Sequence, residues 1–354
     1  MYCIRHHLVY SVHMRNIMHA LLIATLAILC GCGNGAATQN LIVVYSPHGK
    51  PLEGDIKQRF EAAHPEYKVS FLDLPGGAIF TRVQQERSRP GASVWWGGSP
   101  GDFRKAESMG LFEPYTPEWA RNLPPEAKSP TGGWVATFRT PELIMYNSKK
   151  IPPAEAPKTW EDLLDPKWKG RIVIRDVRAS ATMKTIFGAL VLREKMKAGN
   201  VDCGFQVLKK LDANTGTYAA DPQIMYDQLN SSGPAAITLW NLADALLRKS
   251  LGDPFDYVIP PETIVPVEPI ALIKGAANPE GAKLFFDFVN SPEQLILMAR
   301  ERHRLPVRTD LPQDQLPAWM KDLKIQPMQL DWNEFDKNID EWIARWDSEI
   351  KGKS

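Results

Sequence analysis

The chain has 354 residues, with 42 lysines and arginines against 41 aspartates and glutamates, and its net charge is +1. This balance lacks the basic footprint of a nucleic-acid-binding protein, so we expect no nucleic-acid partner. The hydrophobic share of 44% is enough to build a core, and the length predicts two domains at roughly 150 residues each.

Residues 1–32 are typical of a lipoprotein signal peptide. Arg15 precedes an apolar stretch, 17–29, that is short for a membrane span. The stretch ends in LCGC, which resembles the lipobox of bacterial lipoproteins, so we expect cleavage before Cys32 and a lipid on Cys32. Met14 would suffice as the start of such a signal. Residues 33–39 are small and polar and predict a flexible tether to the membrane.

Residues 40–138 repeat a strand, a turn and a helix three times, which predicts the first part of an α/β lobe. The strands are expected at 41–45, 68–72 and 94–96, and the turns at 46–49, 75–77 and 97–99. The last short helix should end at Gly110, in the position that favours glycine after a helix. Neighbouring strand residues face opposite sides, so we expect one of Trp95 and Trp96 in the core and the other at a cleft rim.

Residues 139–266 are predicted to form the second lobe, and 267–315 to return to the first. Strands at 135–138 and 143–146 are suited to crossing between lobes, and Thr159 begins a capping-box pattern. Further strands are expected at 172–174, 235–239 and 270–273, and helices at 186–196, 242–248, 282–288 and 293–301. The tail, 316–354, is expected to be helical from 319 to 350, with an aromatic stripe that docks on the body.

Gly97 to Gly101 match the G-x-S-x-G pattern of a serine hydrolase, with Ser99 as the nucleophile. In that motif the residue after the serine donates its N–H to the oxyanion hole, but here it is Pro100, which has no N–H. The usual order of the triad leaves only His303 as a base. We therefore expect a ligand-binding turn rather than an enzyme active site. Glycines let the backbone approach a ligand closely, and a helix N-terminus presents free N–H groups to it.

Several stretches in chain order resemble the extracellular solute-binding proteins of ABC importers, in the cluster that includes the ferric-iron-binding proteins. They are VYSPHGKPLEGDIKQRFEAAHP, GLFEPYTP, TWEDLLDPKWKGRIVIRD, PIALIKGAANPEGAKLFFDFVNSPE and RLPVRTDLP, and they span about 41–312. The resemblance implies a type II periplasmic-binding-protein fold, in which two α/β lobes joined by hinge crossover strands close on a ligand. It also implies solute capture for an ABC permease.

The resemblance to iron-binding members carries over at one position only. Those members use a histidine, where His48 stands, an acid, where Gly97 and Gly98 stand, and two adjacent tyrosines, where Trp240 and Asn241 stand. Ferric iron prefers hard anionic oxygens, so we expect neither a metal site nor a cofactor. A ferric-iron protein that uses Tyr218 and Tyr226 instead is the alternative, and a sensor-kinase subunit or a secreted hydrolase are further ones.

The predicted cargo is a small anionic or polyhydroxylated solute, with an organic phosphate or phosphonate favoured. Four turns before helices, at 46–49, 75–77, 97–99 and 180–182, could face one cleft and supply hydroxyl and N–H donors. Arg178 and Trp240 could add a charged contact and a stacking surface. We expect a monomer at the periplasmic or extracellular face. The predicted ligand-binding residues are Ser46, His48, Gly76, Gly77, Gly97, Gly98, Ser99, Arg178, Ser180, Thr182, Trp240 and Asn241.

Overall fold

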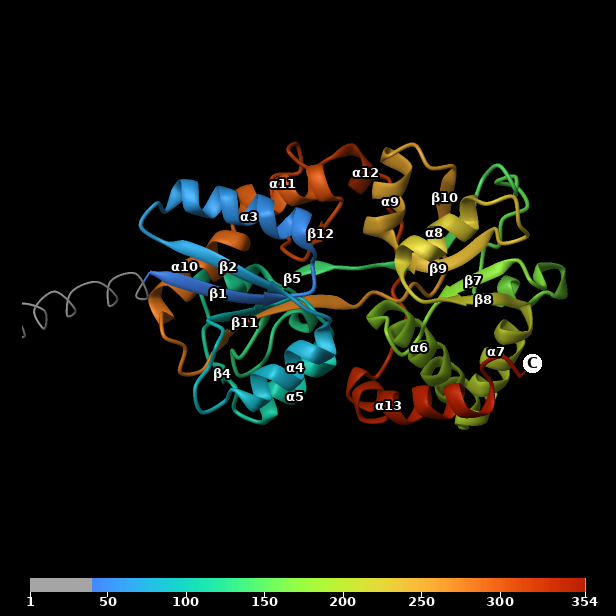
Figure 1. Ribbon diagram of the computed structural model, residues 1–354, viewed down its shortest axis with the longest axis horizontal. Coiled ribbons are helices and arrows are strands. Elements are labelled where there is room, and N and C mark those ends of the chain that lie inside the picture. The colour runs from blue at the N-terminus through green and yellow to red at the C-terminus, as the bar shows by residue number, and fades with distance from the viewer. Residues whose placement is uncertain (1–39, 354) are drawn as a thin grey trace, which may run out of the picture.

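The computed structural model describes residues 40–353, and their strands form two separate sheets (Figure 1). The predicted signal peptide, Cys32 and the tether 33–39 lie outside the described residues. Among the helices of 40–353, none is long and apolar enough to cross a membrane. Each sheet has its own buried core, which gives the two-lobe α/β architecture that the sequence predicted.

The first lobe contains a seven-stranded sheet in the order β12-β5-β11-β3-β1-β2, with β4 paired to β11. The first three strands run parallel, whereas β11 is antiparallel to β3, β4 and β5. The strands are β1 (Leu41–Ser46), β2 (Lys68–Asp73), β3 (Val94–Trp96), β4 (Phe112–Glu113), β5 (Val135–Arg139), β11 (Val267–Ile273) and β12 (Leu305–Pro306). The helices are α3 (Lys50–Ala63), α4 (Gly76–Gln85), α5 (Pro100–Ser108), α10 (Pro279–Val289) and α11 (Pro292–Arg302), with short 3₁₀ turns at Glu118–Asn122 and Pro125–Ala127.

The second lobe contains a five-stranded sheet in the order β10-β6-β9-β7-β8. Its strands are β6 (Glu142–Asn147), β7 (Ile172–Arg175), β8 (Thr215–Ala219), β9 (Ile237–Asn241) and β10 (Phe255–Val258). Its helices are α6 (Ala181–Ala198), α7 (Val201–Asn214), α8 (Pro222–Asn230) and α9 (Leu242–Ser250), with 3₁₀ turns at Glu161–Leu164 and Pro166–Trp168. The capping box is present, because Thr159 and Asp162 each accept a hydrogen bond from the other's backbone N–H.

Two segments that cross between the lobes are hydrogen-bonded to each other. Thr140 N–H donates to Pro266 O at 2.9 Å, and Glu142 N–H donates to Ile264 O at 2.8 Å. The tail crosses between the lobes beside them as a third segment. Thr263 N–H donates to Gln326 O, and Met328 N–H donates to Thr263 O, both at 2.8 Å. The chain therefore passes between lobes through adjacent extended segments, an arrangement that suits a hinge.

The tail differs from the continuous helix expected for 319–350. Helix α12 (Ala318–Lys321) is a single turn, and α13 (Trp332–Glu349) begins only after an extended segment. Pro327 lies in that segment, where it pairs with Thr263, and proline cannot continue a helix from the preceding turn. The aromatic stripe does dock as predicted: Phe335, Trp342 and Trp346 are buried in the core of the second lobe, and α13 lies along α6 and α7 (Figure 1).

Candidate functional site

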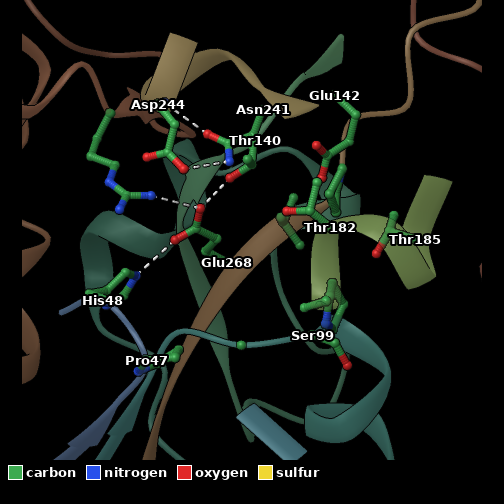
Figure 2. A pocket seen from close by; sticks show the side chains of 16 residues that line it. Pro47, His48, Ser99, Thr140, Glu142, Thr182, Thr185, Asn241, Asp244 and Glu268 are labelled. Atoms are coloured by element: carbon green, nitrogen blue, oxygen red, sulfur yellow. Dashed lines mark hydrogen bonds and ion pairs between the residues drawn. The ribbon is translucent and has the colours of Figure 1, made fainter. Parts of the chain in front are cut away.

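A cavity of about 210 Å³ lies between the lobes, next to the paired crossing segments. Its volume is below the roughly 300–1,000 Å³ that is usual for drug-sized ligands, so it suits a small solute. Residues from at least six separate elements meet there (Figure 2). The lining consists of Pro47, His48, Gly98, Ser99, Pro100, Thr140, Glu142, Ala181, Thr182, Thr185, Asn241, Asp244, Pro266, Val267, Glu268 and Arg304.

Three helices begin at the cavity wall. Ser99 caps α5 and accepts from Asp102 N–H at 3.1 Å, and Asn241 caps α9 and accepts from Asp244 N–H at 2.9 Å. Ser180 caps α6, whose first residues Ala181 and Thr182 line the cavity. The first N–H groups of a helix have no partner within it and carry partial positive charge, so three such ends favour an anionic group.

His48, Glu268 and Arg304 form a network on one side of the cavity. His48 Nε2 and Glu268 Oε2 lie 2.8 Å apart, His48 Nδ1 lies 3.0 Å from Ser46 Oγ, and Arg304 Nη1 donates to Glu268 Oε1 at 3.2 Å. Burial lowers the pKa of His48, although Glu268 opposes this. Burial would raise the pKa of Glu268, but Arg304 and His48 outweigh it and lower that pKa to about 2. The site therefore holds an ionised carboxylate, paired with a guanidinium, beside a neutral imidazole.

Glu142 is the least satisfied polar group of the cavity. Its side chain lines the wall although the residue is only 1% exposed, and its Oε2 atom has no hydrogen-bond partner among the described residues. Burial, together with the carboxylates of Glu268 and Asp244, raises its pKa well above the ordinary value. In Figure 2 the Glu142 side chain extends from β6 in the direction of Thr182. Its environment therefore favours the protonated form of the Glu142 carboxyl group.

Of the predicted residues, five line the cavity: His48, Gly98, Ser99, Thr182 and Asn241. Four others lie just behind the wall. Ser46 is fully buried against His48, and Ser180 caps α6 from behind. Gly97, at φ +89°, has its Cα beside the His48 ring, and Gly76 packs against Gly98.

Arg178, Gly77 and Trp240 are outside the cavity lining. Arg178 is on the surface, where its Nη1 donates to Asp347 of α13 at 3.1 Å. Trp240 belongs to the core of the second lobe and its Nε1 donates to the Tyr226 hydroxyl at 2.8 Å. The expectation that four turns face one cleft is therefore met by three, since the Gly76-Gly77 turn begins α4 behind them.

The prediction for Trp95 and Trp96 is wrong, because both are fully buried. Trp95 packs on Phe103 at 4.3 Å between ring centroids, and its Nε1 donates to Gly97 O. Trp96 lies 4.5 Å from the His48 ring and its Nε1 donates to Thr137. Helices cover both faces of the first sheet (Figure 1), so neither side of β3 is left as a rim.

The tyrosines considered as iron ligands also lie away from the cavity. The Tyr218 hydroxyl donates to Asp212, and Tyr226 accepts from Trp240. Burial raises the pKa of both hydroxyls above the ordinary value, which opposes the tyrosinate form that ferric iron requires. Across residues 40–353 no group of three or more histidine, cysteine, aspartate or glutamate side chains is arranged to hold a metal.

Six cavity residues with polar or charged side chains were not predicted from the sequence: Thr140, Glu142, Thr185, Asp244, Glu268 and Arg304. Thr185 lies one turn after Ala181 on α6, and Asp244 lies three residues after Asn241, so helical spacing could have indicated both. Glu268 sits in a strand otherwise rich in apolar residues, VEPIALI, where a lone acid is a signal for a site. Arg304 had no local signal.

Two α/β lobes, paired crossing segments and a small polar cavity between them define a two-lobe binding protein. Residues 99–338 match the family of bacterial extracellular solute-binding proteins, and the chain belongs to this family. It is the solute-binding component of an ABC importer, as the resemblance implied.

Relatives from several bacteria match most of the chain. A probable ABC transporter periplasmic-binding protein, y4fP of Sinorhizobium fredii, is 29% identical, covering 95% of this chain and 94% of its own. Iron uptake protein A1 of Synechocystis is 25% identical, with 83% of each chain covered. A putative 2-aminoethylphosphonate-binding periplasmic protein of Salmonella typhimurium is 26% identical, covering 78% of this chain and 82% of its own.

The fold is also that of solved periplasmic binding proteins. AfuA from Actinobacillus pleuropneumoniae, solved with fructose-6-phosphate bound, superposes with a TM-score of 0.73 at 25% identity. The match covers 88% of this chain and 98% of AfuA. The relatives are named as periplasmic solute-binding proteins, which implies a periplasmic or extracellular location.

Proposed function

We propose that the solute is a small organic phosphate ester or phosphonate, held at the cavity by the N-termini of α5, α6 and α9. The observation that carries this proposal is the convergence of these three helix ends, with Ser99, Thr182 and Thr185 hydroxyls among them. Each helix end favours a negative charge by ~0.3–1 kcal/mol, and by up to ~2 kcal/mol when partly buried. Three ends and the hydroxyl donors together support micromolar binding, about −8 kcal/mol.

The names of related proteins agree with this class. AfuA was solved with a sugar phosphate, and the Salmonella relative is named for a phosphonate. Iron is the second candidate, because another relative is named for iron uptake. The residues of the cavity favour the organic solute, since Tyr218 and Tyr226 are engaged elsewhere and His48 is bonded to Glu268.

Isothermal titration calorimetry tests the proposal. Fructose-6-phosphate, glucose-6-phosphate, 2-aminoethylphosphonate and ethylphosphonate are titrated into purified protein, alongside ferric citrate. We expect micromolar or tighter binding of at least one phosphate or phosphonate and no tight binding of iron. Tight iron binding with a tyrosinate colour, and no response to any of the four organic solutes, would overturn the assignment.

We also propose that the protein works as a lipid-anchored monomer. The support is the sequence alone: the LCGC stretch ending the apolar segment, and the small polar residues 33–39 that follow. Peptide mass mapping of membrane-extracted protein should find an acylated Cys32 at the N-terminus, and an unmodified N-terminus elsewhere would contradict it.

The proposed division into 40–138, 139–266, 267–315 and 316–354 is supported by the way the strands divide between the two sheets.

A further inference from the structure

Glu142 and Asp244 leave the cavity with acidic groups that no cation of the lining neutralises. The lining contains three carboxyl groups, Glu142, Asp244 and Glu268, and one guanidinium, Arg304. Arg304 is bonded to Glu268, and His48 also lies against Glu268 with its pKa lowered by burial. Among residues 40–353, Asp244 Oδ2 accepts only from the neutral amide of Asn241, at 3.0 Å. A purely anionic solute would therefore meet uncompensated acids at one end of the cavity.

The buried carboxyl group of Glu142 is an independent indication that the cavity binds a hydrogen-bond donor. Glu142 is 1% exposed and one of its oxygens has no hydrogen-bond partner among the described residues. Such a carboxyl group loses its hydration without compensation, so buried polar atoms are usually paired in folded proteins. Thr140, from the crossing segment, gives its hydroxyl to Glu268 and not to Glu142. Glu142 lines the cavity, so a hydrogen-bond donor on the solute placed beside its carboxyl group would supply the partner that this group lacks.

We propose that Glu142 and Asp244, the latter in the first turn of α9, form a subsite for an ammonium group, so that the solute is a zwitterion whose anionic end lies at the N-termini of α5 and α6. An ammonium group brings three N–H donors and one positive charge, which match the free Glu142 oxygen and the acidic excess. This inference rests on the proposed function and specifies its solute.

Ammonium binding favours the ionised form of Glu142. The charged groups that face Glu142 are the carboxylates of Asp244 and Glu268, because Arg304 and His48 are engaged by Glu268. Burial and these two carboxylates raise the pKa of Glu142. A positive charge beside Glu142 favours its ionised form, so the proton leaves as the ammonium binds. Binding then releases up to one proton per solute, and affinity rises with pH until the solute amine itself loses its proton, near ~10.

A matched pair of solutes isolates the subsite. 2-Aminoethylphosphonate and ethylphosphonate share the phosphonate and the ethyl chain and differ by the ammonium group. We expect the amine-bearing solute to bind the wild-type protein at least about tenfold more tightly at pH 7.5. In Glu142→Gln, which keeps the shape and removes the ionisable group, that ratio should fall to about one, with ethylphosphonate little affected.

Titrations in two buffers of different ionisation enthalpy count the protons released. The wild-type protein should release protons with 2-aminoethylphosphonate, and Glu142→Gln should release none. Thermal unfolding of Glu142→Gln checks that the variant folds. Asp244→Asn gives a second test, because asparagine can still accept from Asn241 but removes the negative charge of Asp244. Arg178→Ala, on the surface and outside the cavity, is the control that should change neither ratio nor proton count.

The possible failures are distinguishable. If ethylphosphonate or a sugar phosphate binds at least as well as 2-aminoethylphosphonate, or if affinity falls as pH rises, the ammonium subsite is wrong while the proposed solute class stands. In that case Glu142 acts as a neutral donor to the anion. If no phosphate or phosphonate binds, both proposals are overturned.

Discussion

The imidazole of His48 and the carboxylate of Glu268, which are 220 positions apart in the chain, meet at 2.8 Å across the wall of the cavity. His48 follows β1 and Glu268 lies in β11, so the first and last long strands of the first lobe bring them together. Arg304 Nη1 donates to the other carboxylate oxygen, Glu268 Oε1, at 3.2 Å. This relationship sets the charge on one side of the site.

Glu268→Gln should destabilise the protein and change how its stability depends on pH. The pKa of Glu268 is about 2 in the folded protein and about 4.3 when unfolded. Its contribution, on the order of 3 kcal/mol, is therefore fully present above about pH 4.5 and is lost as pH falls through 2. Urea unfolding at pH 7 and pH 3 should show a smaller difference between the two pH values for Glu268→Gln than for the wild-type protein, and equal pH dependence would contradict the network.

Ser99→Ala and Ser180→Ala form a matched pair of cap variants. Both serines accept the N–H three residues on, so each substitution should cost ~1 kcal/mol of stability. Only Ser99 lines the cavity, so Ser99→Ala should also weaken solute binding, by about tenfold for a lost bond to a charged group. Calorimetry on both variants tests this, and equal losses of affinity would mean that the solute reaches Ser180.

Gly97→Ala should be far more damaging than Gly110→Ala. Both glycines have positive φ, +89° and +68°, and alanine in the left-handed region costs roughly 1–2 kcal/mol. At Gly97 the added methyl group would also overlap the His48 ring, whereas at Gly110 it would meet nothing within 4 Å. Chemical denaturation of the two variants should separate the clash from the backbone strain, and similar losses would argue against the close approach of His48.

Trp346→Ala should destabilise the second lobe by ~3–5 kcal/mol, because the side chain is fully buried between Phe187 and Tyr218. Trp332, at the start of the same helix, is only half-buried, so Trp332→Ala is the matched control with a smaller cost. Thermal unfolding measures both. A negligible effect of Trp346→Ala would mean that the tail is not part of the lobe's core.

Small-angle scattering should find a monomer whose radius of gyration decreases when a bound solute saturates it. The reason is that the lobes are joined by the paired segments at Thr140 and Pro266, and both lobes contribute to the cavity. Protein without solute, measured at the same concentration, is the control. An unchanged radius at saturation would indicate that no hinge closure accompanies binding.

The sequence by itself determined the alternation of strands and helices, the turns at 46–49 and 97–99, and the docking of the aromatic stripe of the tail. These features depend on local periodicity and on residues such as Gly110 and Ser99, whose conformational preferences act within a few positions. Helices α7 and α8 escaped the sequence analysis, although Asn200 and Asp221 cap them.

Only the tertiary structure decided which side chains share the cavity. Glu142, Glu268 and Arg304 come from three crossing or returning segments, and their meeting depends on how the two sheets sit against each other. Trp240 and Arg178 had residue types suited to ligand contact, but packing placed one in the core and the other in a surface ion pair. Burial and charge pairing are collective properties of the folded chain, so a single sequence does not reveal that Glu142 is enclosed with an unpaired oxygen.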